Sequence, residues 1–335
     1  MNLRHILLSL SLLSSLAAAA QEQSWFPELS TSTTTNFSWS GEKITNFTLS
    51  SMDADWRNAG NGFSGQISYD VVMKQFMGLN AAWRFAPWLQ IKVGEQKHVY
   101  LNELSTSPRT LEVCGYSLGT SYLGGYTKDL CGYSTRARDW GVTFNGDVFK
   151  QTGGRYFLSY NLGVFNGNGF HIKDDNAAKN LTAMLSLHPS ESLTLSLGGL
   201  LGKYTVTSSE GDTRLGNRNR VSAGVWFNNK KFIIKSESVW GDTDGLQSIG
   251  TFVLAGWWFR SNMAIAARGD SFLKDLKDAD SRISKAEICL THTLGPVFRY
   301  RIQYGHTFYA APGMESLNTL TLSVSMKFST KMIAK

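Results

Sequence analysis

Apolar and polar residues alternate along many short segments of this chain. In residues 156–164 the even-numbered positions carry Tyr, Leu and Val, and in residues 320–328 they carry Leu, Val, Met and Phe between Thr, Ser and Lys. A period of two places the two sets on opposite faces of a β-strand. The pattern therefore predicts an all-β chain whose strands each have one apolar and one polar face.

Sixteen segments of this kind occur along the chain, with lengths near the ~9–11 residues that a tilted strand needs to cross a bilayer. They are 32–40, 44–57, 62–74, 78–86, 88–97, 136–149, 155–166, 178–188, 192–204, 218–229, 231–241, 249–260, 262–271, 283–293, 296–308 and 318–328. An even number of such strands predicts a transmembrane antiparallel β-barrel with sixteen strands and both termini on the periplasmic side.

The connections between these segments fall into two classes. Short links follow the even-numbered segments, and most odd-numbered segments are followed by longer ones, as in the outer loops of a bacterial outer-membrane barrel. The longer connections are 98–135, 167–177, 205–217, 242–248, 272–282 and 309–317. A structureless loop as long as 98–135 is uncommon, so we expect it to fold inward as a constriction loop.

The N-terminus has the pattern of a secretory signal peptide. Arg4 and His5 precede an apolar run over residues 6–16, and the small residues Ala17 to Ala20 follow. We expect residues 1–20 to be removed after Ala20, which leaves 21–335 as a single barrel domain. This predicts the bacterial cell outer membrane as the location, and export excludes nucleic acid as a partner despite the net charge of +7.

Four motifs occur in order over about residues 90–190. They are IKVGEQK at 91–97 with LSTSPR at 104–109, RDWGVTFNGD at 138–147, YNLGVFNGNG at 160–169, and KNLTA at 179–183 running on to His188-Pro189. This series resembles the strands around the constriction loop of the phosphate-selective porin O/P family. The resemblance implies a sixteen-stranded homotrimeric barrel that passes anions.

Basic residues outnumber acidic ones, 33 to 26. A positive bias in a narrow pore raises the local concentration of anions, and guanidinium forks suit phosphate oxygens. The residues expected to form the ion pathway are Lys92, Lys97, Arg109, Arg136, Arg299 and Arg301. We therefore expect a passive porin for small, preferentially anionic solutes, with phosphate as a candidate.

Two other interpretations of these charges stay open. Lumen charges often pair into structural networks, and basic loop residues often bind lipopolysaccharide at the outer surface. A structural or adhesive barrel with a plugged lumen is the alternative to a porin, although about sixteen strands usually enclose an aqueous channel.

Three cysteines offer further chemistry. Cys114 and Cys131 both lie in the long loop, and export permits a disulfide between them; two free thiols are the alternative. Cys289 is expected to be a small inward-facing filler. His and Cys do not cluster at the spacing of a zinc site, so neither a metal nor a cofactor is expected. None of the histidines lies in a nucleophile motif such as Gly-x-Ser-x-Gly, which argues against an enzyme.

Overall fold

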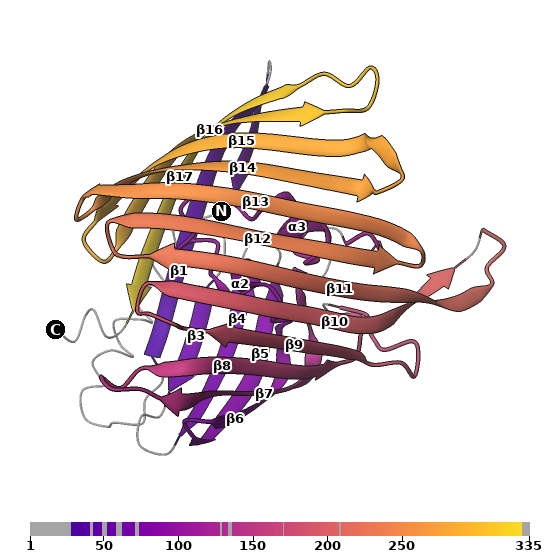
Figure 1. Cartoon of the computed structure of the whole chain (residues 1–335), viewed down its shortest axis with the longest axis horizontal. Helices are drawn as coiled ribbons and strands as arrows, with labels where there is room; N and C mark the ends of the chain where they lie inside the picture. The colour runs from indigo at the N-terminus through magenta and orange to yellow at the C-terminus, as the bar shows by residue number, and fades with distance from the viewer. Residues whose placement is uncertain are drawn as a thin grey trace.

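The computed structural model describes residues 28–40, 43–48, 52–57, 62–70, 74–127, 129–132, 136–169, 171–207 and 209–329. The expected signal peptide at 1–20 lies outside these residues. Among the described residues, we find no helix with the length and apolar character that a membrane span requires. Strands make up most of the described chain and belong to a single sheet (Figure 1).

The described residues form seventeen strands. They are β1 (Glu28–Ser40), β2 (Lys43–Thr48), β3 (Met52–Arg57), β4 (Phe63–Asp70), β5 (Gln75–Ala86), β6 (Leu89–Lys97), β7 (Arg138–Lys150), β8 (Tyr156–Phe165), β9 (Asn180–Leu187), β10 (Leu193–Thr207), β11 (Thr213–Asn228), β12 (Phe232–Thr243), β13 (Leu246–Arg260), β14 (Met263–Asp275), β15 (Asp278–Leu294), β16 (Phe298–Tyr309) and β17 (Leu317–Ser329).

Antiparallel pairing runs round the whole sheet and returns to its first strand. Each strand from β3 onward pairs with the next, and β17 pairs with β1 over eleven residue pairs. On its other edge, β1 pairs with β2 near its C-terminal end and with β3 near its N-terminal end. Because β2 and β3 both lie beside β1, one after the other, they together fill a single strand position. The seventeen strands therefore occupy the sixteen positions that the sequence predicts.

The alternation of side chains is the reverse of that in a soluble protein. On β11, Arg220 is fully buried, whereas its neighbour Val221 is 54% exposed. On β17, Leu320 and Leu322 face outward and Ser323 is buried. An apolar outer face with polar side chains turned inward is what lipid on one side and water on the other require. The fold is therefore a transmembrane antiparallel β-barrel, as expected.

The expected long loops at 242–248 and 272–282 are wrong, because the strands continue through them. Asp244 and Gly245 alone join β12 to β13, both with positive φ (54° and 90°), as in a tight type I′ hairpin turn. Beyond the bilayer both faces of a hairpin meet water, so the strand continues although the apolar alternation ends. The alternation therefore predicted the part of each strand that faces lipid and missed the extensions.

The segment between β6 and β7 lies inside the barrel and contains the short helices α2 (Asn102–Ser105) and α3 (Leu118–Tyr122) (Figure 1). Its apolar residues pack on the inner wall: Tyr100, Leu101, Leu104 and Leu123 form one buried cluster with residues of β10, β12 and β14. The wall residues of this cluster are Leu200, Val239 and Phe272. The predicted inward-folded constriction loop is confirmed, and it lies against one side of the barrel.

Candidate functional site: the channel constriction

Carboxylates on the barrel wall hold the starts of both loop helices. Glu237 on β12 accepts hydrogen bonds from the backbone N–H groups of Asn102 (2.6 Å) and Glu103 (3.0 Å) at the start of α2. Asp270 on β14 accepts one from the N–H of Leu118 (2.7 Å) at the start of α3. The first N–H groups of a helix have no partner within the helix, so these two side chains satisfy donors that the fold would otherwise bury.

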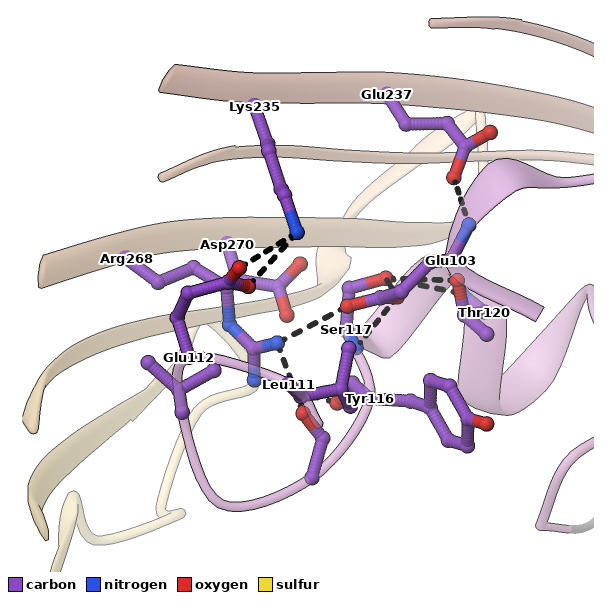
Figure 2. A network of polar contacts seen from close by, with 12 residues as sticks. Glu103, Leu111, Glu112, Tyr116, Ser117, Thr120, Lys235, Glu237, Arg268 and Asp270 are labelled. Carbon is purple, nitrogen blue, oxygen red and sulfur yellow. Dashed lines mark hydrogen bonds and ion pairs between the residues drawn. The ribbon is translucent and has the colours of Figure 1, made fainter. Parts of the chain in front are cut away.

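Glu103 links α2 to the chain before α3 and to the wall (Figure 2). Its buried carboxylate accepts hydrogen bonds from the N–H (2.9 Å) and hydroxyl (2.7 Å) of Ser117. Arg268 on β14 donates to the same carboxylate (3.2 Å) and to the carbonyl oxygens of Gly115 (3.0 Å) and Tyr116 (3.2 Å). One guanidinium therefore binds three points of the loop.

The other end of the loop is held by a buried ion triad. Asp129 accepts from Arg218 (2.8 Å) and Arg220 (3.1 Å) on β11, and all three side chains are inaccessible to solvent. Burial alone would raise the pKa of the Asp129 carboxyl, but the two guanidiniums outweigh it and hold the pKa below its ordinary value. Asp129 is therefore ionised at neutral pH.

Arg299 and Arg301 on β16 hold the middle of the loop. Arg299 donates to the carbonyl oxygens of Arg109 (2.7 Å) and Leu111 (2.9 Å), and Arg301 donates to those of Leu111 (3.2 Å) and Val113 (3.0 Å). Both were expected to attract anions. Their N–H groups are instead directed largely at the loop backbone, although Arg301 also lines the cavity described below.

Lys97, at the end of β6, also contacts the loop. Its ammonium donates to the carbonyl oxygen of Leu104 and to the hydroxyl of Tyr116, both at 3.0 Å. Lys97 therefore braces the loop from the strand that precedes it, while its side chain reaches the cavity.

A cavity of about 770 Å³ lies between the loop and the wall formed by β4 to β8. The loop is held against the opposite wall, so this cavity lies on the side of the constriction where the loop leaves space. Basic side chains reach it from both sides. They are Lys92, Lys97, Arg109, Arg136, Arg138 and Arg301.

The lining of this cavity is strongly unbalanced in charge. Among the described residues that line the cavity, six side chains are basic and only Asp70 is acidic. The Asp70 carboxylate is itself paired, because Nη1 of Arg136 lies 3.4 Å from its Oδ2. Five of the six residues expected in the ion pathway therefore share one cavity, and Arg299 does not line it. Arg138 was not among them: the alternation in β7 puts it on the same face as the exposed Trp140 and Phe144, so the pattern gave no signal that it lines the cavity.

All three cysteines are free thiols in the structure, which for Cys114 and Cys131 is the alternative that the sequence left open. Cys131 lies beside Asp129, and burial followed by that carboxylate raises its pKa to about 12. Cys114 packs against the apolar cluster that contains Cys289 of β15. The structure therefore gives Cys114 and Cys131 different surroundings: Cys131 lies beside Asp129, and Cys114 lies at the cluster with Cys289.

Comparison with known proteins supports the fold through structure alone. No family model matches the chain, and no curated protein matches it. The fold is similar to an anion-selective porin from Comamonas acidovorans (TM-score 0.64, 10% identity, 90% of this chain and 98% of that chain). It is also similar to the outer-membrane protein OmpT of Vibrio cholerae (0.63, 10%, 90% and 97%) and to OmpF of Salmonella typhi (0.62, 12%, 90% and 97%).

These neighbours are bacterial outer-membrane proteins that include porins, and the chain shares their fold over nearly its whole length. The fold agrees with the outer-membrane location that the sequence predicts. The finer resemblance to the phosphate-selective porin O/P family stays a prediction.

Proposed function

We propose that this protein is a passive outer-membrane porin through which small solutes diffuse, with a preference for anions. The observation that supports this most directly is the lining of the constriction cavity, where six basic side chains face one carboxylate. Fixed positive charge beside a narrow aqueous path concentrates anions and repels cations.

The way in which the loop is held supports passive diffusion. Wall side chains on β11, β12, β14 and β16 contact the loop at several points along its length. A loop held at so many points gives the passage a fixed bore, so solute size and charge alone would decide passage. The charge at the bore would then favour every small anion over every small cation, whatever their chemical identity.

Inorganic phosphate is the anion of first interest. Arg109, Arg136 and Arg138 present guanidinium groups to one cavity, and guanidinium forks match phosphate oxygens well. We also propose a homotrimer, because a trimer form of Vibrio cholerae OmpT is among the similar structures. Binding of lipopolysaccharide by basic loop residues remains part of this proposal.

Reversal potential across a planar bilayer in a KCl gradient tests the preference for anions. We expect a chloride-selective current in the wild type and a weaker preference in the double variant Lys92→Gln/Arg109→Gln. A charge worth about 1 kcal/mol to an ion near it changes relative entry roughly fivefold. Addition of phosphate to one side then distinguishes a phosphate site, which would block the chloride current, from a general anion preference.

Lys277→Gln is the control. Lys277 is exposed in the tight turn between β14 and β15, so the variant loses one positive charge at a residue that does not line the cavity. A wild type that prefers potassium, or a double variant no different from Lys277→Gln, would contradict the proposal. Absence of current from a correctly folded protein would favour the plugged structural barrel.

A further inference from the structure

Two cysteines that are far apart in the sequence come near each other where the loop packs against the inner face of the barrel wall. Cys289 lies on β15 with its side chain fully buried, in an apolar cluster that also contains Val113 of the loop, and Cys114 packs against this cluster. Proximity of two cysteines is the first requirement for a disulfide between them.

Hydrogen bonds on both sides of Cys114 hold it in this position. The N–H of Cys114 donates to the side-chain oxygen of Gln303 (2.6 Å), and Gln303 lies directly opposite Cys289 in the pairing of β15 with β16. The preceding carbonyl, that of Val113, accepts from Arg301 (3.0 Å). The backbone at Cys114 is therefore fixed to the same patch of wall that carries Cys289.

The two thiols differ in access. Cys114 lines the constriction cavity and can be reached from the lumen, whereas Cys289 is sealed behind it. The neighbouring Cys289 thiol, whose effect outweighs burial, lowers the pKa of Cys114 to about 7. A large share of Cys114 is then thiolate at neutral pH, the form that attacks a disulfide. Cys131, with its raised pKa, is much less reactive.

We propose that Cys114 and Cys289 form a disulfide that fastens the constriction loop to the barrel wall after export. The Cys114 thiolate attacks a disulfide of an exported thiol oxidant, which forms a mixed disulfide and releases one oxidant sulfur as thiolate. Cys289, as its proton leaves, attacks the Cys114 sulfur and releases the second oxidant sulfur. Two protons and two electrons pass from the cysteines to the oxidant, which becomes a dithiol.

Peptide mapping of the unreduced, alkylated wild-type protein tests this proposal without any substitution. Trypsin cuts after Arg109, Lys128, Arg136, Lys285 and Arg299, so the three cysteines fall in the separate peptides 110–128, 129–136 and 286–299. We expect 110–128 linked to 286–299, with Cys131 alkylated. A link between 110–128 and 129–136, or three alkylated cysteines, would overturn the proposal.

Electrophoresis of variants gives a second, independent measurement. A bond from residue 114 to residue 289 closes a large loop in the denatured chain, so reduction should slow the migration of the wild-type protein. The matched variants are Cys131→Ser, which should keep this shift, and Cys289→Ser, which should lose it. Retention of the shift in Cys289→Ser, or its loss in Cys131→Ser, would contradict the assigned pair.

Discussion

Gly119 in α3 and Gly250 in β13 place the backbone of the loop in direct contact with the backbone of the wall. A Cβ atom on Gly250 would lie 2.4 Å from the Cα of Gly119, and one on Gly119 would lie 2.9 Å from Cγ1 of Val239. Glycine is the residue that allows so close an approach. Because both residues lack a side chain, α3 can lie close against the wall. This close approach sets the width that is left for solutes.

Gly250→Ala should push α3 away from the wall and into the passage. Overpacking of this kind costs about 1–3 kcal/mol, and movement of the loop is the easiest relief because the wall is held by the strand pairing. We expect a lower single-channel conductance. Gly269→Ala is the control, because a Cβ there meets no atom within 4 Å. Equal conductance in the two variants would show that α3 does not limit the bore.

Arg301→Lys separates charge from geometry. The substitution keeps the positive charge at the cavity but loses the fork that binds the carbonyl oxygens of Leu111 and Val113. We expect the sign of ion selectivity to be unchanged, with larger current fluctuations and a changed size limit for neutral sugars. Arg260→Lys, at an exposed strand end, serves as the control. A reversal of selectivity with a steady current would contradict this division of roles.

Asp129→Asn should destabilise the protein strongly. It leaves Arg218 and Arg220 buried without their counter-charge, and loss of one partner of a buried ion pair costs about 3–5 kcal/mol. Unfolding in guanidinium chloride at pH 7 measures the loss. Asp280→Asn, an exposed carboxyl in the β15 extension, is the matched control and should change little.

The effect of Asp129 should also depend on pH. Its pKa in the folded protein lies below the ordinary value of 3.8, so its stabilising contribution is complete above that value and is lost as pH falls through the folded pKa. The stability of the wild type and of Asp129→Asn should converge in that acidic range. A constant difference down to that range would show that the carboxylate charge is not what stabilises the loop.

The sequence predicted the barrel because lipid imposes a period of two on every strand. It predicted the inward loop from length alone, and it placed Arg299 and Arg301 on the lumen face through the same alternation. It could not show what those guanidiniums bind. Their partners are loop carbonyls about 190 residues away along the chain, and the path of an irregular loop has no period from which contacts can be predicted.

The same reason explains the cysteines. Nearness in sequence favoured Cys131 as the partner of Cys114, whereas the fold brings Cys114 to Cys289. By contrast, the sequence does contain a local signal for the turn between β12 and β13. The pair Asp244 and Gly245 is a strong hairpin sequence, and it lies beyond the lipid-facing part of the strands, where the apolar alternation ends.

The position of the loop's contacts on the wall has a consequence for biogenesis. The loop follows β6, but most of the wall side chains that hold it lie on β11 to β16, at separations of 89 to 193 residues. Contacts between such distant parts of a chain form late. A half-inserted barrel would therefore leave its bore unobstructed, and the permeability barrier would be established only when the C-terminal strands have entered the membrane.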